Sequence, residues 1–165
     1  MPKIAIRPVA LADSSDILQG IGEGELCDAV PGSEAVRTEA DAAAMVSNLV
    51  GKGAAGTELH FSICLENSKV VGMCALHDFD HKRHSAKIGY WISRPYRKKG
   101  FGKEAVGLLI KVAFEELGIR KLYAVAGQDN VASVHFLRSL NFADAGTSRD
   151  VTMGGKLLFS LQKTA

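Results

Sequence analysis

Hydrophobic and polar residues alternate through the middle of the chain in a way that predicts three consecutive strands. In residues 59–66 every second residue is apolar, and this period of two is typical of a half-buried strand. Asn67-Ser68 then predicts a turn into a second strand over residues 70–76. A polar stretch, residues 77–85, leads into a third apolar strand at residues 88–92, so this region is expected to form a meander.

The segment before this meander has the pattern of a strand and two helices. Residues 4–7 alternate and predict a first strand, and Asp13 is expected to be the N-cap of the helix that follows. Thr38 and Asp41 stand three residues apart ahead of an apolar stripe, which predicts a capped amphipathic helix that ends near Gly51.

The segment after the meander alternates between helical and extended patterns. The predicted elements are a helix, a strand, a second helix and two strands, at residues 103–117, 122–126, 130–140, 143–152 and 156–161. The order of all these elements contains no linker, repeat or low-complexity break. We therefore expect a single α/β (α+β) domain over residues 1–165.

Composition and charge narrow the function classes. The chain has 165 residues, 47% of them hydrophobic, which is typical of one globular domain rather than a disordered chain. The formal net charge is +2, yet residues 94–103 carry five cations and no acid, so the other 155 residues hold 15 cations and 18 acids, or −3. A near-neutral chain with one short basic segment is poor support for nucleic-acid binding.

The cysteine pattern and the first residues bear on the compartment. Cys27, Cys64 and Cys74 are odd in number and lack CxxC spacing, which favours reduced thiols over disulfides or a zinc site. Residues 1–12 contain no long apolar segment, and no apolar run reaches the ~18 residues of a membrane span. These features predict a cytoplasmic protein without a membrane partner.

The basic segment lies between the strand at residues 88–92 and the helix from residue 103, and it contains Gly100 and Gly102. Glycine lets the backbone turn tightly and approach a ligand, and the first N–H groups of a helix have no partner within the helix. Together with the positive end of the helix dipole and the nearby cations, they predict a phosphate or pyrophosphate site. The alternative is an ordinary strand-to-helix turn with solvated lysines.

Two motifs in this chain resemble those of the GNAT superfamily of N-acetyltransferases. Arg97-x-x-Gly100-x-Gly102 is similar to the family's acyl-CoA pyrophosphate loop, and Asn130-x-x-Ser133 opens a helix similar to a second family segment. The strand at residues 88–92 makes the chain look most like the branch of ribosomal-protein alanine N-acetyltransferases. The resemblance implies the GNAT fold, with a mixed, mostly antiparallel sheet of about six to seven strands and about four helices.

The resemblance also implies how acetyl-CoA would bind as the cosubstrate, with no metal. The loop would hold the pyrophosphate, the backbone after the third meander strand would pair with the pantetheine arm, and the arm would pass the Asn-x-x-Ser segment. The thioester would lie where this strand and the next one diverge. The implied contact residues are Ile92, Ser93, Arg97, Lys98, Lys99, Gly100, Phe101, Gly102, Lys103, Asn130 and Ser133.

The implied reaction is direct transfer of acetyl to a primary amine, either a protein N-terminus or a small molecule. Many relatives carry a Tyr seven residues after the Asn, but Leu137 occupies that position, so Ser133 is the candidate general acid, with helix capping or CoA binding as its alternative role. The general base stays unassigned because Lys87 replaces the family's frequent Glu. Candidates are a water chain to solvent or the side chains of His77, Asp78, Asp80, His81, His84 and His135.

Competing interpretations carry less support. Loss of the usual base and Tyr leaves open a non-catalytic acyl-CoA-binding module with the same fold, and a P-loop nucleotide binder lacks its motif. Gly51-x-Gly53-x-x-Gly56 has dinucleotide-fingerprint spacing but follows a helix, so a flexible loop is expected. The histidines of residues 77–84 lack metal-site spacing. A homodimer is compatible with the sequence, although no exposed apolar stripe requires one.

Overall fold

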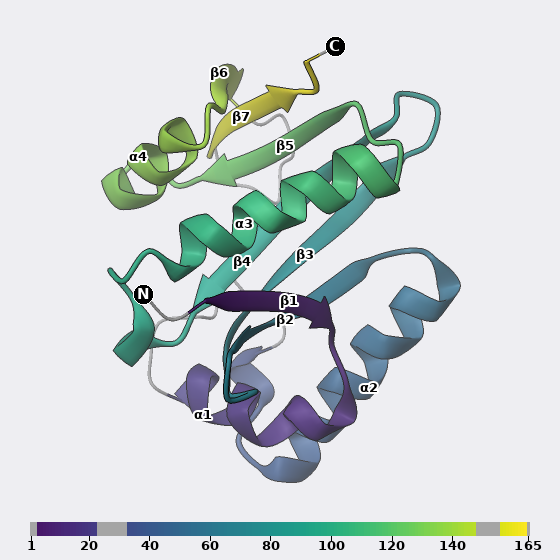
Figure 1. Ribbon diagram of the computed structural model, residues 1–165, viewed down its shortest axis with the longest axis vertical. Helices are drawn as coiled ribbons and strands as arrows, with labels where there is room; N and C mark the ends of the chain where they lie inside the picture. The colour runs from purple at the N-terminus through teal and green to yellow at the C-terminus, as the bar shows by residue number, and fades with distance from the viewer. Residues whose placement is uncertain (1–2, 23–32, 148–155, 165) are drawn as a thin grey trace.

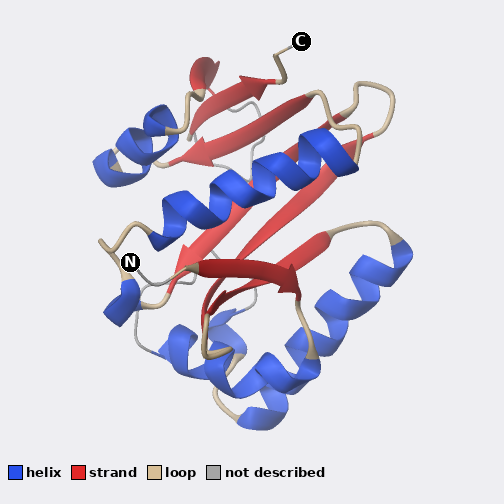
Figure 2. Ribbon diagram, in the orientation of Figure 1, coloured by secondary structure: helices blue, strands red, loops and turns tan. Residues whose placement is uncertain are grey.

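The computed structural model describes residues 3–22, 33–147 and 156–164, and these form one seven-stranded sheet with helices on both faces (Figures 1 and 2). The strand order is β1-β2-β3-β4-β5-β7-β6, and every neighbouring pair is antiparallel except β4 and β5. The strands are β1 (Ile4–Pro8), β2 (Leu59–Leu65), β3 (Val70–Asp80), β4 (Ser85–Ile92), β5 (Lys121–Ala126), β6 (Ala143–Thr147) and β7 (Leu157–Gln162). The expected GNAT-type architecture is confirmed.

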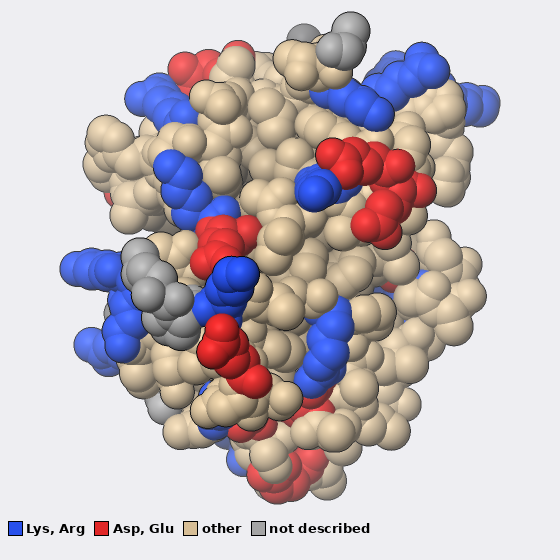
Figure 3. All heavy atoms as spheres, in the orientation of Figure 1, with Lys and Arg blue, Asp and Glu red and all other residues tan. Residues whose placement is uncertain are grey.

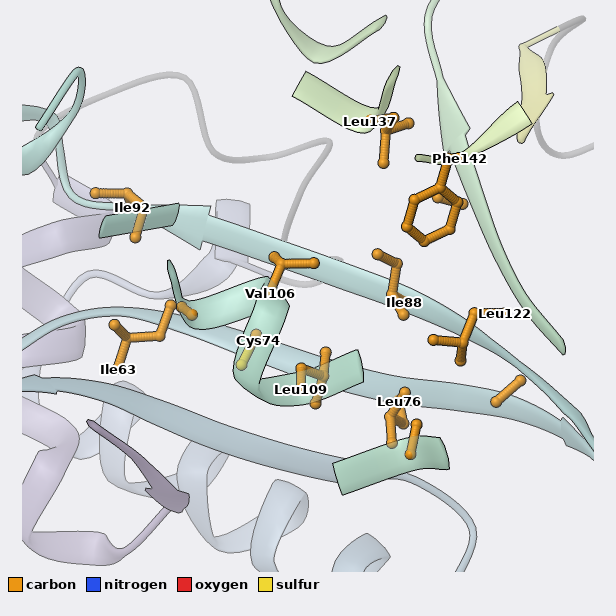
Figure 4. Close-up of a cluster of buried hydrophobic side chains, with 14 of the residues drawn as sticks. Ile63, Cys74, Leu76, Ile88, Ile92, Val106, Leu109, Leu122, Leu137 and Phe142 are labelled. Carbon is orange, nitrogen blue, oxygen red and sulfur yellow. The ribbon is translucent and has the colours of Figure 1, made fainter. Parts of the chain in front are cut away.

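Four α-helices divide the core between the two faces of the sheet. The helices are α1 (Ser14–Gly22), α2 (Glu39–Ala55), α3 (Phe101–Lys111) and α4 (Val131–Ser139). Apolar residues of α1 and α2 pack with Met73 and Trp91 on one face. On the other face, α3 and α4 bury a larger cluster that includes Leu109, Leu122 and Leu137 (Figure 4). Because successive side chains of a strand point to opposite faces of the sheet, one set packs against α1 and α2 and the other against α3 and α4.

Strands β4 and β5 run side by side for only a short distance. Their parallel register pairs Ser85 with Lys121, Ala86 with Leu122 and Lys87 with Tyr123, and then stops, although both strands continue. Figure 1 shows the two strands diverging toward the ends that lie near the starts of α3 and α4. We call this divergence the β4–β5 splay. The sequence resemblance predicted the divergence between these same two strands, and the register confirms it.

Three local predictions need correction. Helix α2 does not end near Gly51 but continues to Ala55, and Gly56 closes it with a left-handed φ of 72°, so the glycine-rich stretch is a helix end rather than a loop. Most of the polar stretch at residues 77–85 belongs to strands, because β3 extends to Asp80 and its pairing with β4 continues as far as Asp80 and Ser85. Asp13 does not cap α1 forward, because its carboxylate accepts hydrogen bonds from Arg7, Ser62 and the backbone N–H of Ala10.

Other sequence-derived signals are confirmed in detail. Thr38 and Asp41 form the expected capping box at the start of α2. Asn141, after the last turn of α4, stands where the resemblance places a Gly, and its φ of 67° is the left-handed conformation that Asn tolerates. Cys64 and Cys74 are buried free thiols, whereas Cys27 lies outside the described residues. Burial raises the pKa of Cys74 to about 12, so this thiol stays protonated.

Candidate active site

The loop before α3 has the backbone geometry of a ligand-facing turn. Gly100 has a φ of 84°, and no side chain caps the helix that starts after it. The N–H groups of the first helical turn, beginning at Phe101, are therefore open to an external acceptor. Lys98, at the position where the resemblance places a frequent loop Gly, also has a positive φ, 61°. The loop keeps a left-handed residue at that position without a glycine.

Arg97 fixes this loop to the end of β4. Its Nε donates a 2.9 Å hydrogen bond to the carbonyl oxygen of Ile92. Ser93, which follows Ile92, donates its N–H to the carbonyl oxygen of Val71 at 2.8 Å and has a buried side chain. Two backbone groups that the sequence analysis offered to the pantetheine arm are thus engaged within the protein. The open positions lie farther back along β4.

The backbone edge of β4 beyond the paired segment faces the splay. Because Ser93 N–H points toward β3, and backbone groups alternate between the two edges of a strand, those of Ile88, Tyr90 and Ile92 point toward β5. The β4–β5 register ends at Lys87 and Tyr123, a parallel pair that uses the N–H of Ile88. The carbonyl oxygen of Ile92 is taken by Arg97, so the open groups on this edge are centred on Tyr90 and include the N–H of Ile92. A pantetheine arm carries amides, so it can pair with this edge as an added strand would.

Cations surround the start of α3. Figure 3 shows Lys and Arg side chains projecting at the left edge of the molecule, beside the loop that precedes α3 in Figure 1. Lys98, Lys99 and Lys103 are exposed, and the Nζ of Lys99 lies 5.8 Å from the ring centroid of Tyr96. These mobile charges add to the positive end of the α3 dipole, so the predicted pyrophosphate residues are gathered at one place.

Asn130 and Ser133 meet at the start of α4. The Oδ1 of Asn130 accepts the N–H of Ser133 at 3.1 Å, which caps the helix and leaves the Ser133 hydroxyl for another partner. It lies close enough to Tyr90 to affect that hydroxyl, and the Tyr90 ring stacks on Phe136 with the centroids 4.5 Å apart. Burial raises the pKa of Tyr90, and the Ser133 hydroxyl opposes this only in part. The tyrosine therefore remains a proton-bearing hydroxyl at the splay.

Tyr90 is a site residue that the sequence analysis missed. The residue belongs to an apolar strand, so its pattern indicates only packing. The family position expected to hold a Tyr hydroxyl is on α4, where Leu137 is 1% exposed and belongs to the core. The structure instead brings a hydroxyl from β4 to the same helix. A tyrosine near the end of the strand before the phosphate loop is the one sequence signal that could have pointed to it.

Lys87, which stands in place of the family's frequent Glu, pairs with a carboxylate. Its Nζ lies 3.3 Å from Oδ2 of Asp78, and that oxygen lies 3.4 Å from Nδ1 of His77. Asp80, His81 and His84 of the same hairpin are turned away at its far end, where Asp80 accepts the backbone N–H groups of the turn. Among the described residues, no three His, Cys, Asp or Glu side chains are grouped as metal ligands.

The resemblance implies an acceptor pocket between the helices of residues 13–51 and the strands around residues 147–156. Of these walls, residues 23–32 and 148–155 lie outside the described residues. A recess of about 50 Å³ lies between α1, the β2–β3 turn and the end of β4, lined in part by Asp16, Lys69 and Ser93. This volume has room for about one or two water molecules and is too small for a peptide.

Comparison with known proteins identifies the family. The family profile described as "Acetyltransferase (GNAT) domain" matches residues 3–143. The chain belongs to this family of acetyltransferases. An uncharacterized N-acetyltransferase, p20 from Bacillus licheniformis, is 30% identical and aligns with 98% of this GNAT chain and 93% of its own length. The protein is thus an acetyltransferase enzyme, and the comparisons give no support to a non-catalytic module.

Solved GNAT structures superimpose on the whole described fold. The ribosomal L7/L12 α-N-protein acetyltransferase RimL, in complex with coenzyme A, has a TM-score of 0.85 at 16% identity and covers 96% of this chain and 93% of its own. The microcin C7 self-immunity acetyltransferase MccE, in complex with acetyl-CoA and AMP, has a TM-score of 0.83 at 18% identity and covers 98% of this chain and 93% of its own. At this identity they establish the fold, not the acceptor.

No helix among the described residues of this GNAT protein is long and apolar enough to cross a lipid bilayer.

Proposed function

We propose that this protein transfers acetyl from acetyl-CoA directly to a primary amine, with the N-terminal amine of a polypeptide as the first acceptor class to test. The observation that carries the proposal is the β4–β5 splay, which opens next to an uncapped helix start surrounded by cations. The polypeptide acceptor is supported by the ribosomal-protein acetyltransferases among the structural neighbours, such as RimL. A small-molecule amine is the second acceptor class.

The geometry of the described residues supports an assignment of roles. The N–H groups at the start of α3, from Phe101 onward, would bind the pyrophosphate together with Lys98 and Lys99. The open backbone edge of β4 would align the pantetheine arm, and a β4 N–H at Tyr90 or Ile92 would stabilise the oxyanion that forms when the amine attacks the thioester.

The hydroxyl of Ser133 is the group we propose to protonate the departing CoA thiolate. A thiol of ordinary pKa near ~8.5 is a tolerable leaving group, so this donor has a modest task. The nearness of Tyr90 to Ser133 supports the role, because a second hydroxyl can return the proton. The cap bond of Asn130 uses only the Ser133 backbone, so it does not compete with the hydroxyl.

The proposal is tested first by turnover. Purified protein is incubated with acetyl-CoA and one of three amines, a hexapeptide with a free N-terminal alanine, spermidine or free lysine, and CoA release is followed with a thiol reagent. We expect CoA release with the peptide to exceed thioester hydrolysis. Release that never exceeds hydrolysis with any of the three, together with no calorimetric binding of acetyl-CoA, would contradict the proposed function.

The role of Ser133 predicts a separation between chemistry and binding. Ser133→Ala is expected to lower kcat for acetyl transfer by roughly 10- to 100-fold, because only the thiolate donor is lost, and to change the Kd of acetyl-CoA by less than about threefold. Tyr90→Phe, which keeps the stacking on Phe136, should give a smaller loss of kcat. Equal losses of kcat and affinity in Ser133→Ala would reduce Ser133 to a CoA contact.

A further inference from the structure

The two faces of the sheet at the β4–β5 splay differ in chemistry. On the face of α3 and α4, Ile88, Ile92 and Leu122 belong to the buried apolar cluster, and Tyr90 bridges β4 to α4. On the opposite face the register aligns His77 of β3 with Lys87 of β4, and Lys87 with Tyr123 of β5. Among the described residues at the splay, the first face therefore offers an amine only hydroxyl groups, whereas the second face offers the imidazole of His77.

His77 reaches across β4 to the point where the splay begins. The last β4 residue that the register pairs with β5 is Lys87. Gly89, two residues later, has its backbone beneath the imidazole, since a Cβ built on Gly89 would lie 3.7 Å from Nε2 of His77. The register partner of Gly89 is Ala75, so the two smallest side chains flank this position. Nε2 thus overlies the first part of β4 that has lost its β5 neighbour.

The second nitrogen of the same ring faces a carboxylate. Nδ1 of His77 lies 3.4 Å from Oδ2 of Asp78, and the side chain of His77 is 30% exposed. A carboxylate beside Nδ1 favours the tautomer with its proton on Nδ1, which leaves the lone pair of Nε2 directed toward Gly89. The arrangement of orienting acid, imidazole and open ring nitrogen is that of a general base.

We propose that His77, through Nε2, is the general base that takes the proton from the acceptor ammonium group. This role rests on the proposed acetyl transfer and supplies the base that the sequence left unassigned. The acceptor gives one ammonium proton to Nε2, and the freed nitrogen lone pair forms the C–N bond while the C–S bond breaks. A second proton from that nitrogen replaces the proton that the thiolate receives, so the products are an amide and CoA thiol. His77 returns its proton to solvent.

His77 and Lys87 share one carboxylate. The Oδ2 of Asp78 lies 3.4 Å from Nδ1 of His77 and 3.3 Å from Nζ of Lys87. His60, on β2, is near enough to His77 for the two rings to influence each other. Burial lowers the pKa of His60, and the carboxylate of Glu58 opposes this. The positive charges of Lys52 and His77 lower the pKa further. A neutral His60 does not repel a protonated His77. The charged and titratable groups near His77 are Asp78 on its own strand, Lys87 of β4 and His60 of β2. Behind them, His60 contacts Glu58, which also pairs with Lys52, and Lys87 is aligned with Tyr123.

The test uses His77→Gln, with Arg83→Gln as the control. Arg83 lies in the turn of the same β3–β4 hairpin, and its side chain is 84% exposed. With the alanine hexapeptide, spermidine and free lysine as probes, we expect His77→Gln to lower kcat by about 100-fold or more with an unchanged Kd for acetyl-CoA. Arg83→Gln should match the wild type. The pH profile of His77→Gln should follow only the ionisation of the probe amine, since no protein base remains.

Two further measurements separate a base from a structural residue. Added imidazole should restore part of the activity of His77→Ala and should leave the activity of the control variant unchanged. Gly89→Ala places its methyl group at ordinary contact distance from Nε2, so the fold is retained while access to the ring falls, and kcat should drop. An aromatic amine of low basicity, offered as a fourth probe, should show a much smaller loss in His77→Gln.

The outcomes distinguish this role from the proposed function. If the wild type acetylates none of the probes, the proposed function fails and the role of His77 fails with it. If the wild type is active and His77→Gln keeps the wild-type kcat and pH profile, His77 is not the base and the acetyltransferase assignment stands. A loss in His77→Gln that imidazole does not restore and that is equal for all amines would likewise overturn the role.

Discussion

Asp13 shows how one carboxylate can hold three segments together. Its side chain is 3% exposed and accepts hydrogen bonds from both terminal nitrogens of Arg7, from the Ser62 hydroxyl and from the Ala10 N–H. Burial by itself raises the pKa of Asp13, but these donors outweigh burial and hold it below the ordinary value. The ionised form is therefore favoured by folding, and its contribution to stability is present at neutral pH.

The pH dependence of unfolding follows from that sign. Because the folded-state pKa is depressed, this contribution is complete above the unfolded value near ~3.9 and is lost as the pH falls through the folded value. Asp13→Asn is expected to lower the free energy of unfolding by about 2 kcal/mol at pH 7, measured in urea, and by much less at pH 2 to 3. Asp144→Asn, at an exposed pair with Arg138, is the control and should change it by less than ~0.5 kcal/mol. An equal loss for Asp13→Asn at both pH values would contradict the account.

The start of α3 is an element whose two glycines have different functions. At Gly100 a Cβ would meet nothing within 4 Å, but the φ of 84° disfavours any other residue. At Gly102 the backbone is ordinary, and a Cβ would make van der Waals contacts with Ile92 at 3.5 Å and Phe136 at 3.6 Å. The first glycine is required by conformation, whereas the second marks the close packing of α3 against β4 and α4.

Alanine substitutions should separate these two functions. Gly100→Ala is expected to cost about 1 kcal/mol of stability and to weaken acetyl-CoA binding, since relaxing the strained residue moves the helix start. Gly102→Ala should be neutral or slightly stabilising, because a helical Gly→Ala change gains up to ~1 kcal/mol where space allows. Urea unfolding and calorimetric titration with acetyl-CoA measure both quantities. Similar effects of the two substitutions would show that packing, not backbone conformation, governs this turn.

The elements differ in how well the sequence predicted them. The start of α2 was predicted correctly from Thr38 and Asp41, because a capping box is a local interaction. Its end was wrongly placed at Gly51, because a glycine inside a helix is tolerated when the flanking residues continue the helix. The ends of β3 and β4 were missed since the polar residues from His77 onward pair through their backbones. For a related reason Tyr90 was missed, and His77 could not be singled out among the candidate bases. Register, and not sequence spacing, sets what lies opposite these two residues.

Over the whole molecule, the excess positive charge is largely one exposed segment at the start of α3, on a body that is slightly acidic. CoA is a polyanion, so attraction between exposed charges should strengthen its binding and should weaken as salt screens it. The Kd of acetyl-CoA is therefore expected to rise by roughly three- to tenfold between 50 and 300 mM NaCl. Isothermal titration at several salt concentrations measures this dependence.

A double variant tests where that attraction originates. The variant combines Lys98→Asn with Lys99→Gln, which removes two charges and keeps at position 98 a residue that tolerates the positive φ. Both the affinity for acetyl-CoA and the salt dependence of that affinity should fall. The control removes the same charge from the turn between β3 and β4, with Lys82→Gln and Arg83→Gln, and should leave the Kd unchanged within about twofold. If the control weakens binding as much as the loop variant, the attraction depends on net charge and not on the segment.

The short β4–β5 ladder has a consequence for how such enzymes diverge. Where Ile88, Tyr90 and Ile92 pass the splay, the cosubstrate edge is made of peptide groups, and every amino acid except proline supplies those groups. Mutation can therefore change side chains on the acceptor face while the means of holding a pantetheine arm is inherited intact. His77 stands across the ladder from Lys87, the position where the resemblance placed a glutamate. The role proposed for His77 would therefore move the proton acceptor by one neighbouring strand and leave the cosubstrate edge unaltered.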